Sequence, residues 1–489
     1  MYKTTIFSIL LYFVCAQGIS SAATYYVDAS AANDSGTGSQ ASPKKYIPSG
    51  IALMSSSGGD TLIINSGTYE GSSNNITTLK SGTSGSYNVI KAATDGGVII
   101  SANLAISSGS FVSLEGLKFT ATATKSCDGT YIKFLRCAFQ GGKTCSSGCD
   151  GEVVFAAGSY QLYEDCWFYG VGGRYTLVIY EGSHDVFRRC VIRRDGGYTF
   201  DGSNPEAPLA NYGAAYISYQ NCIIIDNNLS YSDGYTSSIY ATGHTSNPAS
   251  NHVEFIGCIE LNGKGASFYV DTDDGSTGMS FTDCIFYKNE TGIADGNTGT
   301  ALTLNRLTIG NMSHDAMSRW SGSISLTNGL VFNHTGEGSG TKTVTYTNTY
   351  NPSSYSGTGV THINPLTNGL LYIPRIEASS ALKTSGSGGG QMGAQVVYKV
   401  GAAGTLYGEA GFNTVTSNAL WPWPNEDRIK SDLASVSGGA RGFATGTSRD
   451  GSSQTLTKYI WEYLGNQIPA DIYSDVSAPN NLSIVSVTK

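Results

Sequence analysis

The sequence predicts an all-β protein in the form of a right-handed parallel β-helix, and two features of the chain support this prediction. An eight-residue pattern, with apolar residues at its first, third and eighth positions and cysteine or leucine at its sixth, recurs at intervals of 20 to 36 residues. Gly, Asn, Asp and Ser separate short apolar runs from about Tyr87 to Tyr350. Repetition at such intervals is typical of solenoids, whose coils stack on one another.

The repeated pattern indicates which side chains point into the predicted core. The first and third positions of the pattern are apolar, such as Val253 and Phe255, and one residue separates them. A two-residue bend precedes the sixth position. Because side chains alternate between the faces of a strand, these residues and the sixth position are predicted to point inward. A β-sandwich is the main alternative fold, but it gives no reason for cysteine at one fixed phase. The sixth position holds Cys137, Cys166, Cys190, Cys222, Cys258 and Cys284, with Leu117 and Leu307 in two further repeats.

We interpret the six repeated cysteines as reduced core residues. Nine cysteines remain after the predicted leader, an odd number, and free cysteine commonly behaves as a small apolar residue. Cys127, Cys145 and Cys149 lie outside the repeated position. Export would permit a disulfide within this trio, whose pairing the sequence leaves open, and the lack of an accompanying histidine argues against a metal site.

Residues 1–23 are predicted to be a signal peptide. They contain one lysine, an apolar run from Ile6 to Cys15, and small residues at Ser21 and Ala23 that suit cleavage. The run is too short to span a bilayer, and no later stretch approaches about 20 apolar residues. We therefore expect a secreted protein, extracellular or periplasmic, that does not insert into a membrane.

The rest of the chain is divided into three predicted parts. Residues 24–365 are assigned to the β-helix, 366–475 to a C-terminal closing region of mixed structure, and 476–489 to a linker-like tail. Asn425 to Leu433 and Thr457 to Leu464 are candidate short helices. Only 13% of residues are charged and the net charge is −8, which argues against nucleic acid as a partner. We expect a monomer that binds polysaccharide.

A column of aromatic residues lies six positions before the repeated cysteine or leucine. Its members are predicted to face outward with rings about 4.8 Å apart, the spacing of neighbouring strands. The rings are either a stacking platform for sugars or a ladder that stiffens the sheet. The residue directly before the cysteine alternates in charge between coils, as in Asp165 and Arg189, which predicts structural ion pairs. The aromatic column is Phe111, Tyr131, Tyr160, His184, Tyr216 and His252, of which Tyr131, Tyr160, Tyr216 and His252 are candidate substrate-binding residues.

Five arginines are concentrated between Arg174 and Arg194, in a chain with only 29 Lys and Arg. Guanidinium groups bind carboxylates in bidentate fashion, so a uronic-acid polymer is a suitable ligand. Elimination across a uronate requires neutralisation of the carboxylate, a base for the C5 proton and an acid for the leaving oxygen. The alternative interpretation is a solvated, salt-bridged loop face. The candidate catalytic residues are Arg174, His184, Arg193, Arg194 and Tyr212, and Glu181 and Arg188 are candidate substrate-binding residues.

A second polar group contains Asp271, Asp273 and Asp274 in the segment YVDTDDGSTG. Carboxylate oxygens are suitable ligands for Ca²⁺, so these residues are a candidate metal site, although they match only part of a calcium-binding loop. An ordinary Asp/Gly turn is the alternative. Glycoside hydrolysis would instead require a carboxylate pair, for which the sequence offers Asp195, Asp201 and Glu206.

The opening segment, with Gly59-Asp60-Thr61-Leu62, Gly67-Thr68-Tyr69 and YNVIKAATDGGVIIS from Tyr87 to Ser101, resembles the pectate-lyase-like superfamily of right-handed parallel β-helix proteins. Its first coils look most like chondroitinase-B-type and alginate lyases, which use a Lys and an Arg for elimination with calcium at neighbouring acids. The resemblance implies that the helix-like stretch near Ile47 to Met54 caps the first coil, because a solenoid exposes strand edges and core at its ends. Neither the Arg-His-Gly motif of the alginate-lyase group nor the Arg-x-Pro-x-x-Arg signature of pectate lyases occurs in the sequence. The resemblance therefore predicts the fold and assigns no catalytic residue.

Two functions are compatible with the sequence. The first is a secreted carbohydrate-active enzyme, either a polysaccharide lyase acting on an acidic, uronate-containing glycan or, as a second choice, a glycoside hydrolase. The second is a non-catalytic extracellular β-helix that binds glycan or acts as a structural or adhesin protein. The arginine and aromatic residues favour the enzyme, whereas the lack of known motifs favours the binding protein.

Overall fold

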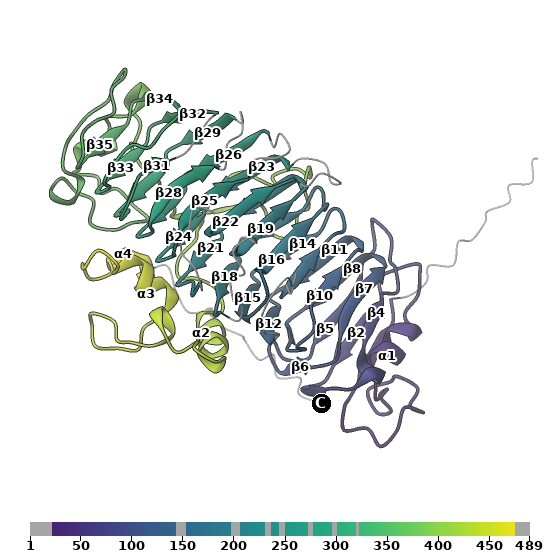
Figure 1. Ribbon diagram of the computed structural model, residues 1–489. Helices are drawn as coiled ribbons and strands as arrows, with labels where there is room; N and C mark the ends of the chain where they lie inside the picture. Colours follow the sequence, from purple (N-terminus) through teal and green to yellow (C-terminus); the bar gives the residue numbers. More distant parts are fainter. Residues whose placement is uncertain are drawn as a thin grey trace, which may run out of the picture.

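The computed structural model describes residues 22–142, 153–196, 206–229, 236–243, 250–271, 277–295, 301–318 and 322–474. These residues form a long stack of coils, and successive coils add strands to three sheets (Figure 1). In chain order a coil passes from sheet I, with 13 strands, to sheet II, with 12, and then to sheet III, with 10. Neighbouring strands within each of these sheets are parallel; Ile132, for example, pairs with Val112 of the preceding coil. The prediction of an all-β parallel β-helix is confirmed.

From β2 to β33 each sheet takes every third strand. Sheet I consists of β1 (Thr24–Val27), β2 (Thr61–Ile64), β5 (Asn88–Ala92), β8 (Ser110–Glu115), β11 (Thr130–Leu135), β14 (Leu162–Glu164), β17 (Val186–Arg188), β20 (Ala215–Gln220), β23 (Asn251–Ile256), β26 (Met279–Thr282), β29 (Ala301–Asn305), β32 (Ser323–Thr327) and β34 (Thr341–Thr345). Sheet II consists of β3 (Gly67–Tyr69), β6 (Val98–Ile100), β9 (Leu117–Phe119), β12 (Ala138–Gly142), β15 (Trp167–Val171), β18 (Val191–Arg194), β21 (Ile223–Ile225), β24 (Ile259–Leu261), β27 (Ile285–Tyr287), β30 (Thr308–Gly310), β33 (Leu330–Phe332) and β35 (Asn348–Tyr350). Sheet III consists of β4 (Ile76–Thr78), β7 (Leu104–Ser108), β10 (Lys125–Cys127), β13 (Val154–Ala156), β16 (Tyr175–Tyr180), β19 (Ala207–Tyr212), β22 (Ser237–Thr242), β25 (Ala266–Val270), β28 (Thr291–Asp295) and β31 (Met317–Ser318).

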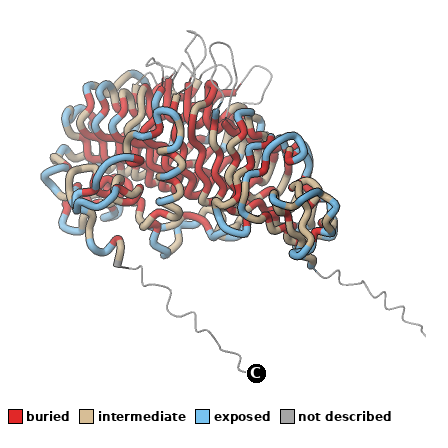
Figure 2. The backbone as a smooth tube through the Cα atoms, turned by 90° about the horizontal axis from the view of Figure 1, so that it is seen from below, coloured by how far each residue is buried: buried red, intermediate tan, exposed pale blue. Residues whose placement is uncertain are grey.

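The interior of the stack is filled by the side chains that the repeated pattern predicts to point inward. In one coil Ile132, Phe134, Cys137 and Phe139 are each at most 1% exposed, and Figure 2 shows the stacked strands as a largely buried body. All six repeated cysteines lie in this core and their thiols are free, as is the buried thiol of Cys127. Burial raises the pKa of the Cys166 thiol well above its ordinary value, so this thiol stays protonated. Cys145 and Cys149 lie outside the described residues, as do residues 1–21 and 475–489.

The bends between sheets I and II contain one left-handed residue in most coils, such as Arg189 with φ of 51° and Arg306 with φ of 51°. This conformation costs roughly 1–2 kcal/mol for a residue with a Cβ atom. Ion pairs between neighbouring coils offset part of this cost. Arg189 Nε lies 2.6 Å from Asp165 Oδ1, and Arg306 Nε lies 2.7 Å from Asp283 Oδ1. The charge alternation noted in the sequence therefore corresponds to ion pairs along the stack.

Helices lie at the beginning and near the end of the described chain. α1 (Ile47–Leu53) has a proline, Pro48, in its first turn and places Ile47 and Ile51 in the core beside the first strands. α2 (Glu426–Ser435), α3 (Leu456–Trp461) and α4 (Asp471–Ser474) belong to the C-terminal region, and no helix among the described residues is long and apolar enough to cross a membrane. Short elements complete this description: η1 (Ser72–Asn74), η2 (Pro365–Thr367), η3 (Ala381–Lys383), η4 (Ser387–Gly389), η5 (Gly442–Ala444), and the antiparallel pair β36 (Tyr398–Val400) and β37 (Val415–Ala419).

The C-terminal region covers the outer face of sheet II, where α2 and α3 lie beside the stack (Figure 1). Trp167, on β15, is fully buried there, its Nε1 donates to Asp432 Oδ2 at 2.9 Å, and the guanidinium of Arg428 lies 4.8 Å from its ring centroid. Leu433 of α2 and Ile460 of α3 belong to the same apolar cluster. The chain thus returns along the stack and buries one of its three outer faces.

Candidate functional site

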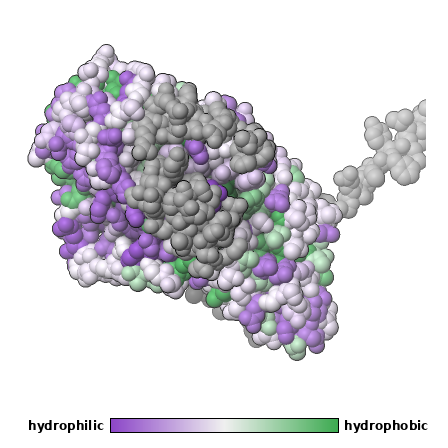
Figure 3. Space-filling view, in the orientation of Figure 1, coloured by the Kyte–Doolittle hydropathy of each residue, from purple (hydrophilic) through white to green (hydrophobic). Residues whose placement is uncertain are grey.

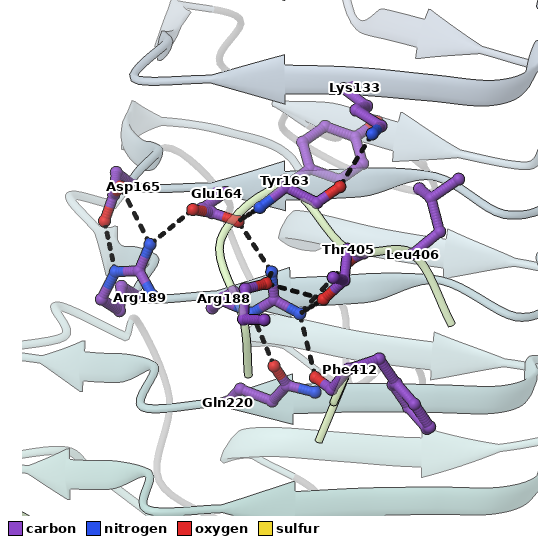
Figure 4. Close-up of polar contacts among 12 residues, drawn as sticks. Lys133, Tyr163, Glu164, Asp165, Arg188, Arg189, Gln220, Thr405, Leu406 and Phe412 are labelled. Carbon is purple, nitrogen blue, oxygen red and sulfur yellow. Dashed lines mark hydrogen bonds and ion pairs between the residues drawn. The ribbon is translucent and has the colours of Figure 1, made fainter. Parts of the chain in front are cut away.

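Arg188, a predicted substrate-binding residue, is fully buried beneath the C-terminal region (Figure 4). Its Nη1 lies 2.7 Å from Glu164 Oε2, and its Nε donates to Gln220 Oε1 at 2.7 Å. The same guanidinium donates to the main-chain oxygens of Ala402, at 2.8 Å, and Phe412, at 2.9 Å. Arg188 therefore fastens the segment from Ala402 to Phe412 onto sheet I, a structural role that accounts for all of these contacts.

Arg193, a predicted catalytic residue, has a similar role on sheet II. It is fully buried, and its Nη2 donates to Leu433 O at 2.6 Å and Gly439 O at 3.0 Å. Nη2 also lies 2.9 Å from Asp195 Oδ1, a carboxylate that Arg441 Nη1 approaches to 2.5 Å. Arg193 thus joins the stack to the C-terminal region that covers it.

Arg194, the next predicted catalytic residue, points toward the corner between sheets II and III. Its Nε lies 2.6 Å from Glu206 Oε1, and both side chains are fully buried. A buried ion pair is held by mutual charge neutralisation, and losing either partner leaves a charge without compensation. In this arrangement Arg194 is separated from solvent.

The aromatic column predicted from the sequence is present at the corner between sheets III and I. Its rings stack with centroid separations of 4.6–4.8 Å and interplanar angles of 9–14°. Every member has a left-handed backbone, with φ between 52° and 59°. Stacking contributes about 0.5–1.5 kcal/mol per aromatic pair, which is comparable to the cost of that conformation. The members are Phe111, Tyr131, Tyr160, His184, Tyr216 and His252.

The stack restricts where a sugar could lie on this column. Because each inner ring has a neighbour on both faces, only ring edges are presented outward. Tyr407 of the C-terminal region also packs edge-on against His184, at 5.2 Å, and Tyr216, at 6.2 Å. Burial lowers the pKa of His184, so this imidazole is neutral at neutral pH. The inner rings fit the ladder interpretation, whereas His252, the last ring, is exposed.

The outer face of sheet III brings together residues that lie far apart in the sequence. Tyr175 lies 6.2 Å from Tyr212 and 6.0 Å from Tyr240, and Tyr240 lies 5.9 Å from Tyr269, measured between ring centroids. Phe155 belongs to the same cluster. The register explains the arrangement, because Ala210 pairs with Tyr240 and Tyr240 with Tyr269 on successive strands.

Two charged residues stand at either side of this tyrosine cluster. Arg174 Nη2 donates to the Tyr175 hydroxyl at 2.8 Å, and its guanidinium lies 4.9 Å from the Tyr175 ring centroid. The Tyr240 hydroxyl donates to Asp271. Burial, followed by the neighbouring Tyr175 and Asp271, raises the pKa of Tyr240 well above its ordinary value, so this phenol is protonated at neutral pH. Among the described residues, a guanidinium, a carboxylate and several largely buried phenols meet on this face, and such groups are suited to recognition of hydroxyl and carboxylate groups.

The predicted catalytic and binding residues therefore lie in several separate parts of the structure. Arg174, Tyr212 and Asp271 meet on the outer face of sheet III, and Glu181 follows the end of β16 beside it. His184 lies in the aromatic column, and Arg188, Arg193 and Arg194 are buried in ion pairs. Sequence reasoning assigned no catalytic or binding role to Tyr175, Tyr240 and Tyr269. Tyr180 and Tyr212 each precede the repeated cysteine by 10 residues, but Tyr240 precedes it by 18, so connections of unequal length hide the alignment.

The described residues contain no group of three His, Cys, Asp or Glu side chains placed to hold a metal ion. Asp271 is the described member of the predicted calcium site, and it accepts the hydrogen bond from Tyr240. Asp273 and Asp274 lie outside the described residues, as does Asp201. Calcium binding remains a prediction.

Comparison with known proteins gives similarity of structure only. No protein-family model matches the chain, and no curated protein sequence matches it significantly. Among solved structures, the chain is similar to the pectate lyase Pel9A, with 16% identity and a TM-score of 0.48 over 77% of this chain and 98% of that one. It is also similar to a rhamnogalacturonan lyase, with 14% identity and a TM-score of 0.38 over 70% of this chain and 85% of that one.

A third similar structure is a mannuronic-acid-specific polysaccharide family 6 lyase from human gut microbiota, with 14% identity and a TM-score of 0.36 over 70% of this chain and 82% of that one. At these identities the likeness is one of fold. The parallel β-helix architecture expected from the opening segment is present in the sheets of the structure itself. The three parallel sheets themselves define the class of this protein as a parallel β-helix.

Proposed function

We propose that this protein is a secreted, carbohydrate-active β-helix enzyme that cleaves an acidic, uronate-containing glycan by elimination on the outer face of sheet III. The observation that supports the proposal is the convergence of Arg174, Tyr175, Tyr212, Tyr240 and Asp271 on that face. It is the place where candidate catalytic residues from separate coils meet outside the buried ion pairs. Calcium bound through Asp271 and neighbouring acids forms part of the same proposal.

The proposed reaction assigns one role to each group. Arg174 neutralises the uronate carboxylate, which makes the C5 proton easier to remove. Tyr212, as its phenolate, takes the C5 proton; the C4–O bond breaks, a C4–C5 double bond forms, and the proton passes from Tyr212 to the leaving oxygen. The Tyr240 hydroxyl donates a hydrogen bond to Asp271. The oxygen of Tyr240 can therefore accept a hydrogen bond from a substrate hydroxyl.

The test is a screen of the full chain against acidic polysaccharides, with and without Ca²⁺, that follows the ultraviolet absorbance of the unsaturated product. We expect cleavage of at least one polymer and a loss of about 100-fold or more in Arg174→Ala and Tyr212→Phe, the scale of removing one general acid–base group. Tyr398→Phe is the matched control, because Tyr398 is exposed on β36, away from sheet III. Absence of product from every acidic polymer under both conditions would exclude the lyase.

Glycan binding without cleavage is the second candidate function. It is favoured by one observation: Arg193 and Arg194 are buried in ion pairs and His184 is stacked within the ladder. In that case an acidic glycan binds the full chain, Arg174→Ala weakens the binding, and no unsaturated product forms. Binding measured by calorimetry beside the product assay separates the two functions.

A further inference from the structure

The last four strands of sheet I carry an ordered array of hydroxyl and amide side chains on their outer face. In β26, β29 and β32 apolar residues that point into the core alternate with residues that point away from it, and β34 follows the same phase, with Lys342 in place of one apolar residue. The strands are in continuous register: Ser280 pairs with Thr303, Thr303 with Ser325, and Ser325 with Thr343. We call this array the hydroxyl face; it consists of Ser280, Thr282, Thr303, Asn305, Ser323, Ser325, Thr327, Thr341, Thr343 and Thr345.

The same outward positions have a different character in the preceding coils. There charged and apolar residues such as Lys133, Leu162 and Glu254 interrupt the column, which also holds Ser113 and Ser218, and Leu406 of the C-terminal region packs on Leu162. The hydroxyl face contains no charged side chain, and Thr303, Ser325 and Thr343 are exposed. The C-terminal chain passes at its margin, where Ser387 N donates to Asn328 Oδ1 at 2.7 Å. The outward positions of this part of sheet I thus carry no charge, and several of them are exposed.

The aromatic column ends where the hydroxyl face begins. Tyr216 covers one face of the His252 ring at 4.6 Å, but the next coil has Gly278 at the corresponding position, with φ of 67°. A Cβ atom at Gly278 would lie 3.7 Å from His252 Cδ2, so a side chain there would begin to cover the ring. Because glycine has none, His252 presents an aromatic face next to the array and is exposed.

We propose that the hydroxyl face and His252 form a second binding surface, specific for an uncharged polysaccharide. An aromatic face packs against the apolar side of a pyranose ring, and hydroxyl and amide groups can donate to and accept from sugar hydroxyls. Neighbouring strands repeat these groups every 4.7–4.9 Å or so, and alternate residues along a strand repeat them about every 6.6 Å, which suits an extended polymer. The surface lies on a different sheet from Arg174 and does not depend on the acidic-glycan site.

The experiment is depletion binding of the full chain to insoluble neutral polysaccharides, namely cellulose, xylan and a β-glucan. We expect retention on at least one of them. His252→Ala removes the exposed ring face, and the double variant Thr303→Ala/Ser325→Ala removes two hydroxyl groups that can bond to the sugar. Each should weaken binding about tenfold. Thr78→Ala/Ser107→Ala is the matched control, because both residues are exposed on sheet III at the opposite end of the stack.

Several results would overturn the proposal. One is retention that the substitutions in the hydroxyl face leave unchanged while circular dichroism shows each variant folded. Another is retention only on acidic polymers, with loss in Arg174→Ala, which would support the sheet III site alone. Thermal hysteresis of ice growth without retention on any neutral polysaccharide would assign the flat array to ordered water instead.

Discussion

Sheets II and III differ in what their outer faces contact. The outer face of sheet II is apolar, with Trp167, Val191 and Ile223, and the C-terminal region covers it. The outer face of sheet III carries Tyr175, Tyr240 and other rings flanked by Arg174 and Asp271. Neighbouring arginines of one sequence segment therefore acquire different roles, because the sheet on which each one lies decides its partners.

The molecular surface is mixed in polarity. In the orientation of Figure 1, hydrophilic residues gather around the last coils and also at the opposite end of the described chain, with apolar residues between and beside them (Figure 3). The uncharged hydroxyl face belongs to the last coils of sheet I. The three sheets thus have one outer face covered by the C-terminal region, one face on which buried phenolic and charged groups gather, and one partly bare polar face.

The largest effect on stability is expected from a substitution in the apolar interface between sheet II and the C-terminal region. Trp167→Ala should lower the free energy of unfolding by about 4 kcal/mol, because it deletes a fully buried ring and the hydrogen bond to Asp432. Tyr240→Phe on sheet III should cost only about 1 kcal/mol, because it keeps the ring and loses one hydrogen bond. Denaturant titration measures both, and equal losses would show that the two faces contribute alike to stability.

A somewhat smaller effect is expected from the arginine that fastens the C-terminal segment to sheet I. Arg188→Met should cost about 3 kcal/mol, because it leaves Glu164 with Arg189 as its remaining ion-pair partner and frees the main-chain oxygens of Ala402 and Phe412. Arg136→Met is the matched control: its side chain is 37% exposed, so its ion pairs contribute about 1 kcal/mol or less. Limited proteolysis should cut the segment from Ala402 to Phe412 faster in Arg188→Met only. An intact segment in that variant would contradict the fastening role.

The smallest effect depends on pH and concerns Glu260, which points from β24 into the core toward sheet III. Its Oε1 accepts from Ser238 at 2.7 Å and Asn289 at 3.1 Å, and burial raises its pKa to about 7. Burial disfavours the charged form of Glu260 in the folded state, so ionisation of this carboxyl lowers the stability of the folded protein. The loss of stability is absent below about pH 4.5, grows as the pH rises to about 7 and is constant above that.

Glu260→Gln keeps the shape of the side chain and removes the charge. It should stabilise the protein by about 2 to 3 kcal/mol at pH 8 and leave stability nearly unchanged at pH 4, as the shift in pKa implies. Unfolding midpoints at the two pH values, compared between the variant and the original chain, measure the difference. A gain of the same size at both pH values would show that the charge of Glu260 is not responsible.

The repeated pattern was sufficient to predict a large part of the architecture. It located the coils, the inward cysteines, the aromatic column and the ion pairs of the bends, as Cys137, Tyr160 and Arg189 illustrate. These features depend on strand alternation and on equal positions in stacked coils, and both are visible in a linear sequence. The composition of the arginine segment, by contrast, did not distinguish binding from structural roles.

The site depended on contacts that the linear pattern does not contain. Arg188 and Arg193 are buried because residues more than 200 positions later return to cover them. Tyr175, Tyr240 and Asp271 meet because connections of unequal length end on neighbouring strands of sheet III. The sequence by itself thus determined the coil, its inward and outward positions and its stacked columns, because these arise from local periodicity. Only the tertiary structure decided which outward face is covered and which charges are paired, because burial and charge compensation depend on segments that are distant in the chain.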